Sequence, residues 1–391
     1  MAGGEPRNHA LDGLRGWAAV AVVFYHSILG ANPALITGVL WPSVWAQRSA
    51  AGVAEKLALS VLSGEMAVQV FFAISGVVLY RSFCALGTGG PVRTSWVFAL
   101  RRFTRIWPVM AVALLGTFAV RVAVHRALPG VAVQSLSALR RNLLLSEYGV
   151  IGATWTLHAE LAMVPALLAC FFAVRRFGRI ALLGCSLYAL AALREHILAG
   201  TDVLLAYALP FALGGVAVEC GMLGALHRSR WAAPVAAGAA LGLVSTYVFL
   251  PLGGVRVAVQ IVPVTVAVGW VAAAPHGRVR RALEAPLSRL LGRLSYSLYL
   301  WNVLVFWILL ALVGEPLDRA YPLPVGLAVG AAATLVTLPL AALSERWLER
   351  PCIALGRTLS RRQPARSLAP TGTASAATTA IATNASAGRS A

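Results

Sequence analysis

The amino-acid sequence predicts an all-α membrane protein, a polytopic bundle of about ten transmembrane helices. Of the 391 residues, 59% are hydrophobic and only 12% are charged. This is more apolar side chain than the core of a soluble globular protein can bury. The apolar residues gather in segments long enough for an α-helix to cross a bilayer. Shorter segments between them hold most of the arginines.

Ten segments have this character, and each is expected to form one membrane-spanning helix: 14–30, 60–80, 103–124, 154–174, 180–198, 203–222, 231–250, 256–274, 294–314 and 323–345. The first segment could also be a cleaved signal peptide. We interpret it as a retained span, because cleavage would remove the charged pair that it carries.

Orientation follows from the positions of the basic residues. The net charge of +19 comes almost entirely from arginine, since Lys56 is the only lysine. Arginines clustered between apolar spans are typical of cytoplasmic loops, so no nucleic-acid partner is expected. With the N-terminus inside, 24 arginine and lysine residues fall on the cytoplasmic side and nine outside. We therefore predict a multi-pass protein of the plasma membrane, with the lipid bilayer as its partner and both termini in the cytoplasm.

The chain is expected to divide into a transmembrane domain, 1–352, and a disordered cytoplasmic tail, 353–391. From Ser367 onward the tail is almost entirely Ala, Thr, Ser, Gly and Pro, which supplies too little apolar surface to fold.

The cysteines predict neither a metal site nor a disulfide framework. They lie in or beside apolar segments without the spacing of metal ligands: Cys84, Cys170, Cys185, Cys220 and Cys352.

Two ionisable residues in the first span are the strongest functional signal. Arg15 and His26 are eleven positions apart, which is about three helical turns, so they lie on one helix face about 16 Å apart. Ionisable groups inside a span are costly and are functional candidates by default. Either residue alone could be an anchor or a packing hydrogen bonder, but the pair on one face favours function.

Polar groups in the next spans could act with this pair. The small pair Ser75-Gly76 would let a neighbouring helix approach closely, and the hydroxyl could bond across that contact. Arg102 and Arg105 are neighbours on one side of the third span at its cytoplasmic end. Their guanidinium groups suit phosphate oxygens, although anchoring at the membrane surface explains them about equally well.

Glu160 is the candidate partner of His26. It lies about 9 Å into the fourth span from the outer side, a depth comparable with that of His26. A carboxylate bonded to one imidazole nitrogen makes the other nitrogen a better base. His158 is more simply explained as an interfacial residue, but it could compete for either role.

Aromatic residues and arginines occur at the cytoplasmic ends of the last two spans. For Tyr296, Tyr299 and Arg346, anchoring at the membrane boundary is the favoured interpretation.

Taken together, these residues resemble the acyltransferase 3 family of integral membrane acyltransferases. The resemblance covers most of residues 11–352 and depends on the order of several motifs: Arg15 with His26, Phe71-Phe72-x-x-Ser75-Gly76, Arg102-x-x-Arg105, Trp155 to Glu160, Ser295-Tyr296-x-x-Tyr299-Leu300-Trp301, and Glu349-Arg350-Pro351. Two positions depart from the pattern. Asn302 stands where many members carry a histidine, and His158 replaces a small residue.

The resemblance implies transfer of an acyl group from cytoplasmic acyl-coenzyme A, most simply acetyl-CoA, to a hydroxyl. The acceptor would be a glycan or a sugar-bearing small molecule such as a macrolide. His26 would be the catalytic base with Glu160 as its support, and Arg15, Arg102, Arg105 and Ser75 would form the donor site. Acyl-CoA would be a substrate, and no permanently bound cofactor is implied. Direct transfer and a His26-acyl intermediate both stay open.

Two other classes of function fit parts of the pattern. A proton-coupled secondary transporter could use the same intramembrane Arg, His and Glu as a proton relay, but no pair of Gly/Pro-interrupted spans is evident at matching positions. A non-catalytic scaffold would leave the register of Arg15 and His26 unexplained.

Overall fold

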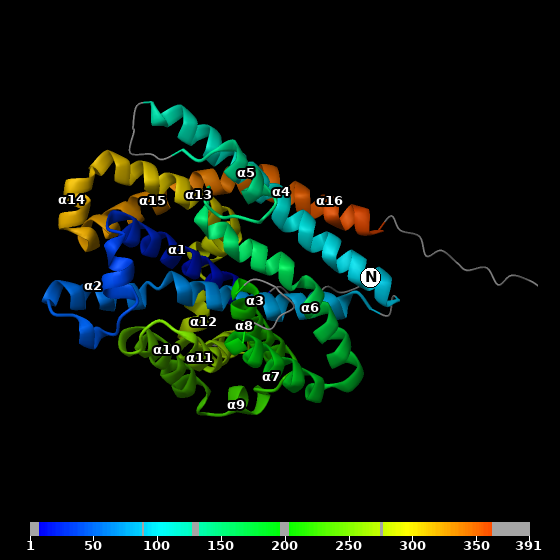
Figure 1. Ribbon diagram of the computed structural model, residues 1–391. Helices are drawn as coiled ribbons and strands as arrows, with labels where there is room; N and C mark the ends of the chain where they lie inside the picture. Colours follow the sequence, from blue (N-terminus) through cyan, green and yellow to red (C-terminus); the bar gives the residue numbers. More distant parts are fainter. Residues whose placement is uncertain (1–7, 88–89, 127–132, 196–202, 274–276, 362–391) are drawn as a thin grey trace, which may run out of the picture.

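The computed structural model describes residues 8–87, 90–126, 133–195, 203–273 and 277–361, which form a bundle of helices without β-strands (Figure 1). Within these ranges, eight helices are long and apolar enough to cross a bilayer, and two shorter apolar helices, Arg179–Leu193 and Tyr207–Glu219, accompany them. The predicted all-α, multi-pass membrane architecture is confirmed.

In chain order the elements are α1 (His9–Ala31), the π-helix η1 (Ile36–Leu40), the 3₁₀-helix η2 (Val44–Ala46), α2 (Ala50–Val61), α3 (Gly64–Ala85), α4 (Pro91–His125), α5 (Leu136–Leu143), the 3₁₀-helix η3 (Gly152–Thr154), α6 (Trp155–Phe177), α7 (Arg179–Glu195), α8 (Val203–Glu219), α9 (Gly224–Arg228), α10 (Ala232–Phe249), α11 (Gly254–Ala273), α12 (Arg278–Leu283), α13 (Pro286–Val313), α14 (Glu315–Ala320), α15 (Pro322–Ser344), the π-helix η4 (Glu345–Glu349) and α16 (Arg350–Arg361). The ten predicted segments overlap α1, α3, α4, α6, α7, α8, α10, α11, α13 and α15.

Helix α1 lies in the interior of the bundle, with α3, α13 and α15 packed against it. Small residues make this packing close. The backbone at Gly16 lies against Leu291 of α13, and Gly330 of α15 lies against Phe24. A methyl group at either glycine would collide with these atoms, so the helices approach this closely only because the side chains are absent.

Helices α3 and α8 form a second close contact. Gly76 of α3 packs against the carbonyl oxygen of Ala212, and Gly215 of α8 packs against the carbonyl oxygen of Ala73. The reciprocal arrangement confirms that Ser75-Gly76 marks a close helix approach. It also fixes the rotation of α3, which directs Ser75 toward α6.

The chain continues as a helix past the predicted domain boundary at residue 352. Cys352 lies in α16, which packs along α4. The backbone of Gly356 contacts Thr104, and Arg101 Nε donates a 3.0 Å hydrogen bond to Ser360 Oγ. The predicted tail is therefore helical as far as Arg361, and its remainder, 362–391, lies outside the described residues. Figure 1 shows that α16 ends at the opposite end of the bundle from α2 and α14.

Candidate active site

Helices α1 and α13 run parallel, which sets the level of each candidate residue in the bundle. Gly16 lies against Leu291, and about four turns further along both helices, Gly30 lies against Phe306. The ring of His26 is 6.0 Å, centroid to centroid, from that of Phe306. His26 is thus at the level of Phe306, while the residues next to Gly16 are level with the first part of α13.

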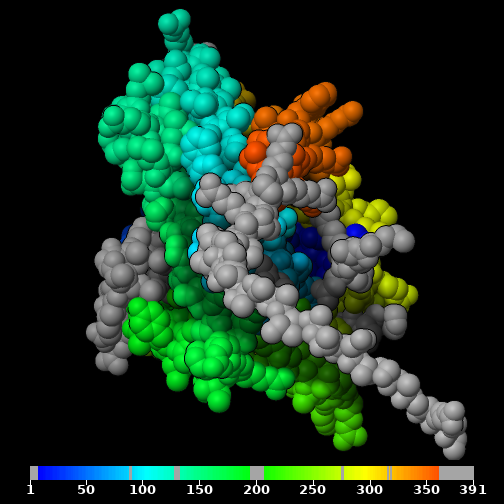
Figure 2. All heavy atoms as spheres, turned by 90° about the vertical axis from the view of Figure 1, so that its right-hand side faces the viewer, coloured from blue at the N-terminus to red at the C-terminus, as the bar shows by residue number. Residues whose placement is uncertain are grey.

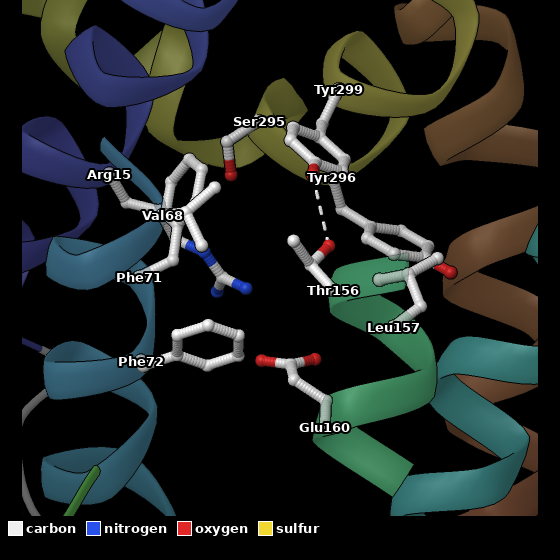
Figure 3. A pocket seen from close by; sticks show the side chains of 10 residues that line it. All are labelled: Arg15, Val68, Phe71, Phe72, Thr156, Leu157, Glu160, Ser295, Tyr296 and Tyr299. Atoms are coloured by element: carbon white, nitrogen blue, oxygen red, sulfur yellow. Dashed lines mark hydrogen bonds between the residues drawn. The ribbon is translucent and has the colours of Figure 1, made fainter. Parts of the chain in front are cut away.

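A cavity opens at the level of Arg15 (Figure 3). It lies between α1, α3, α6 and α13, and its empty volume is about 400 Å³, including the part open to solvent. Apolar and aromatic side chains make most of the wall, with hydroxyl groups and one carboxylate among them. The lining residues are Arg15, Val68, Phe71, Phe72, Thr156, Leu157, Glu160, Ser295, Tyr296 and Tyr299.

Figure 2 views the bundle from the end where α16 finishes. Atoms of α1 are visible there at the floor of a hollow beside α4 and α16. Part of α1 is therefore accessible from this end of the molecule.

Glu160 is held by two neighbours from different helices. Ser75 Oγ of α3 donates a 2.7 Å hydrogen bond to its Oε1. Arg102 Nη2 of α4 lies 2.6 Å from its Oε2, and both side chains of this ion pair are at least nine-tenths buried. A buried carboxylate needs such partners to offset its loss of hydration. The site residues Ser75, Arg102 and Glu160, predicted separately, are thus brought together.

Two other cations near the carboxylate have no such partner. The guanidinium of Arg15 points into the cavity on the side facing Glu160 (Figure 3). Arg105, one turn beyond Arg102 on α4, is within electrostatic reach of both Arg15 and Glu160. Among the described residues, neither Arg15 nor Arg105 forms an ion pair. The buried carboxylate of Glu349 is within electrostatic reach of both cations. Three arginines thus stand against two carboxylates, and the site carries an excess of positive charge.

Tyrosines of α13 fix the cavity wall. Tyr299 OH lies 3.0 Å from Thr156 Oγ1 and donates to the carbonyl oxygen of Ala153 at 3.0 Å. Tyr296 OH donates to the carbonyl oxygen of Ile106 in α4 at 2.6 Å. These bonds tie the start of α6 and the middle of α4 to one stretch of α13. Both tyrosines belong to the site, and their interpretation as boundary anchors does not describe these positions.

The predicted pair of His26 with Glu160 is not formed. Both carboxylate oxygens of Glu160 are engaged by Ser75 and Arg102. His26 Nδ1 is buried and has no hydrogen-bond partner among the described residues. Glu160 lines the cavity with Arg15, and His26 is about 16 Å further along α1. The two groups are therefore at different levels of the bundle.

The error came from the starting depth of α6. The prediction assumed that this helix begins at the outer membrane surface. Instead, the segment before it enters the bundle, with Ile151 and Thr154 fully buried and Ala153 bonded to Tyr299. Helix α6 begins deep inside, and Glu160 lies deeper still.

Two residues that depart from the family pattern lie outside the cavity lining. The ring of His158 contacts that of Tyr148, with 5.8 Å between their centroids. Asn302 Nδ2 donates to the carbonyl oxygens of Leu298 and Tyr299 in its own helix.

Eight of the lining residues were not among the predicted site residues: Val68, Phe71, Phe72, Thr156, Leu157, Ser295, Tyr296 and Tyr299. All of them except Val68 lie within the motifs that carry the family resemblance, and Val68 lies two turns before Ser75 on the same helix.

The comparisons with known proteins place the chain in a family. Residues 8–343 match the family model described as an acyltransferase domain, that of acyltransferase family 3. Curated proteins and solved structures give no match. The matched segment is most of the chain and includes every element that lines the cavity, so the protein belongs to the acyltransferase 3 family and is a multi-pass membrane acyltransferase.

Proposed function

We propose that the protein transfers an acyl group from cytoplasmic acyl-CoA, most simply acetyl-CoA, to a hydroxyl of a glycan or another sugar-containing acceptor. One observation carries the proposal. Arg15 lines a cavity with an excess of positive charge, and His26, whose Nδ1 has no hydrogen-bond partner among the described residues, lies about 16 Å further along the same helix. Anion binding and base chemistry are thereby separated along one helix.

Arg15 and Arg105 bind the donor phosphates in this proposal. Guanidinium groups match phosphate oxygens geometrically. Among the described residues neither cation forms an ion pair, and Glu349 is within electrostatic reach of both. Arg102 and Ser75 act indirectly, because both are engaged by Glu160. The Glu160 carboxylate in turn faces Arg15, so we assign Glu160 a positioning role.

The dimensions of the donor support this division. The pantetheine arm of coenzyme A has about twelve bonds between its phosphate ester oxygen and its sulfur. That equals about four residues of extended polypeptide, or ~14 Å. The separation of Arg15 and His26 along α1 is about 16 Å. With its phosphates near Arg15, an extended donor reaches the level of His26 with its thioester.

The chemistry then needs only one general base. His26 takes the proton of the acceptor hydroxyl as the oxygen attacks the thioester carbonyl carbon. The tetrahedral intermediate collapses with cleavage of the carbon–sulfur bond. The leaving thiolate receives the proton from the imidazolium, which returns His26 to its neutral form. The products are the acyl ester and free coenzyme A.

The outer end of the cavity must open for this reaction. His26 is not among the lining residues, and the wall on that side includes Phe71 and Tyr299, whose rings meet edge to face with 5.9 Å between centroids. Phe71 is half-buried and packs at the border of the two main hydrophobic clusters. We propose that the donor arm displaces Phe71.

The donor side is the cytoplasm in this proposal. The distribution of basic residues, 24 against nine, supports an orientation with both termini inside. The protein would then reside in the plasma membrane, receive acyl-CoA from the cytoplasm and modify its acceptor further out.

The test is a kinetic assay of purified protein with radiolabelled acetyl-CoA, following release of coenzyme A and of labelled product. Arg105→Gln should raise the KM for acetyl-CoA about tenfold or more, because a charge-assisted contact contributes about 1.5–3 kcal/mol. The matched control is Arg93→Gln, an exposed arginine at the start of the same helix. Equal KM values for both variants would contradict the donor site.

A proton-coupled transporter is the rival function, and family membership favours the enzyme. The same assay separates the two classes, because a transporter does not consume acetyl-CoA. No turnover by folded wild-type protein, with or without sugar acceptors, would refute the proposed activity.

A further inference from the structure

A second polar cluster lies away from the cavity, between α3, α10 and α11. Glu65 of α3 and Arg256 of α11 form an ion pair, with 2.7 Å between Oε2 and Nη2. The guanidinium of Arg256 also lies over the ring of Tyr247, 5.0 Å from its centroid. The Arg256 side chain is completely buried. Charges inside membrane-spanning helices are costly and mark functional sites by default.

Amides extend this cluster along α3. Gln69 Nε2 donates to Gln260 Oε1 at 2.7 Å, and Gln260 Nε2 donates to Thr246 Oγ1 at 2.7 Å. Gln69 and Gln260 are fully buried. The chain of bonds joins the same three helices as the ion pair, so the two parts form one outer polar cluster, made of Glu65, Gln69, Thr246, Tyr247, Arg256 and Gln260.

The outer polar cluster is not satisfied by its own members. Nε and Nη1 of Arg256 and Oε1 of Gln69 are buried and have no hydrogen-bond partner among the described residues. Buried polar groups are almost always paired, so these donors and this acceptor need a partner from outside the cluster. Such a partner must both accept and donate hydrogen bonds.

The position of the cluster connects it with the reaction. Glu65 is ten residues from Ser75 on α3, so it lies about 15 Å from the Glu160 level. The ring of Tyr25, the residue before His26, packs directly on the backbone of Gly64. Glu65 itself is 20% exposed, which leaves the cluster an edge at the surface. The cluster therefore lies at the level of His26, on the side of α1 that Tyr25 faces.

We infer that the outer polar cluster is the binding site for the acceptor and that it selects a polyhydroxylated ring, a glycoside, over a simple alcohol. Hydroxyl groups donate and accept at once, which matches the unpaired atoms of both Arg256 and Gln69. The bound sugar would lie beside Tyr25, the residue before His26. One of its hydroxyls could then meet the imidazole of His26. This inference rests on the proposed acyl transfer.

An aromatic rim on the same helix supports this ligand class. Phe249, two residues after Tyr247, stacks on Trp45 of η2 with 5.6 Å between ring centroids. Trp45 is 79% exposed. The C–H face of a pyranose stacks on such rings, while its hydroxyls need polar partners. An exposed aromatic pair beside a buried polar network offers both kinds of contact.

The test compares acceptors at saturating labelled acetyl-CoA. The probes are methyl glycosides of common hexoses, with ethanol as the single-hydroxyl control, and KM is measured for each with wild-type protein and with Gln69→Leu. We expect the KM for the preferred glycoside to rise about tenfold in the variant, since one buried hydrogen bond and its partner are lost. The KM for ethanol and the KM for acetyl-CoA should change less than about twofold.

A second pair of variants guards against misfolding. Thr246→Val removes the last group of the amide chain, whereas Ser245→Ala changes the neighbouring, exposed position of α10, where the hydroxyl bonds only to Leu241 in its own helix. Thr246→Val should raise the glycoside KM, and Ser245→Ala should not.

The outcomes separate the two proposals. Equal increases in KM for glycoside and ethanol would mean that the cluster is structural, and the inference would be overturned. Acetyl-CoA hydrolysis by the wild type without transfer to any glycoside would also overturn it, while the acyltransferase function would stand. No acetyl-CoA consumption at all would refute the proposed function itself.

Discussion

The guanidinium of Arg102 and the carboxylate of Glu160 form an ion pair that joins α4 to α6 inside the bundle, with 2.6 Å between Nη2 and Oε2. Ser75 of α3 bonds the other carboxylate oxygen. Three helices thus meet at one carboxylate. Removing either charged residue would leave the other buried without a counter-charge, which is more costly than losing the pair as a whole.

The ion pair predicts strongly non-additive effects on stability. Arg102→Met or Glu160→Leu alone should each lower the free energy of unfolding by about 3 kcal/mol or more, because each leaves one buried charge unpaired. The double variant should lose much less than the sum. Thermal unfolding of the purified protein in detergent measures all three. Additive losses would mean that the two side chains do not interact.

Loss of the proposed base should abolish turnover without unfolding the protein. We expect His26→Ala to lower kcat by about a hundred- to ten-thousand-fold, the usual contribution of a general base. The thermal unfolding curve should stay close to that of the wild type. The matched control is His158→Ala, since that histidine contacts Tyr148 and lies outside the cavity lining. Near wild-type turnover by His26→Ala would exclude the proposed mechanism.

The contact between α3 and α8 predicts opposite effects of one substitution at two glycines. Gly76→Ala should destabilise the protein by about 1–3 kcal/mol, because its methyl group would collide with the carbonyl oxygen of Ala212. Gly238→Ala, in α10, meets no atom within 4 Å and should be neutral or stabilising, since alanine favours helix. Melting temperatures of both variants check this. Equal melting temperatures would argue against the close packing.

Orientation can be tested by cysteine labelling in intact cells. In a background without native cysteines, a cysteine at Ser135 should react with a membrane-impermeant reagent from outside. One at Ser375 should react only after the cells are opened. The expectation comes from the excess of basic residues on the predicted inner side. Labelling of position 375 from outside would reverse the orientation and remove the argument for a cytoplasmic donor.

The sequence predicted some contacts of the site because they depend on neighbours along one helix. The small pair Ser75-Gly76 indicated a close helix approach, and Gly76 does pack against α8. The Ser75 hydroxyl, however, bonds to Glu160 of α6 and not across that contact. The spacing of Arg15 and His26 on α1 follows from helical geometry alone. Such relations need only the regular rise and rotation of an α-helix.

The partner of Glu160 could not be predicted in this way. The depth of Glu160 depends on how far the segment before α6 enters the bundle. Ile151 and Thr154 of that segment are fully buried, so Glu160 lies well inside the bundle. The same limit applies to Tyr296 and Tyr299, which resemble boundary anchors in sequence but bond to Ile106 and Ala153 inside the bundle.

The sequence by itself determined the all-α membrane fold, the ten apolar segments and the spacing of Arg15 and His26 on one face of α1, because hydropathy and helical periodicity are local properties of the chain. The order of its motifs indicated the family. Only the tertiary structure decided that Glu160 pairs with Arg102, while His26 has no carboxylate partner in the described part of the chain. It also decided that Glu65 and Arg256 meet near the His26 level. The physical reason is that contacts between helices depend on their relative depth and rotation, which close packing at glycines and buried polar bonds fix only when the whole bundle is assembled.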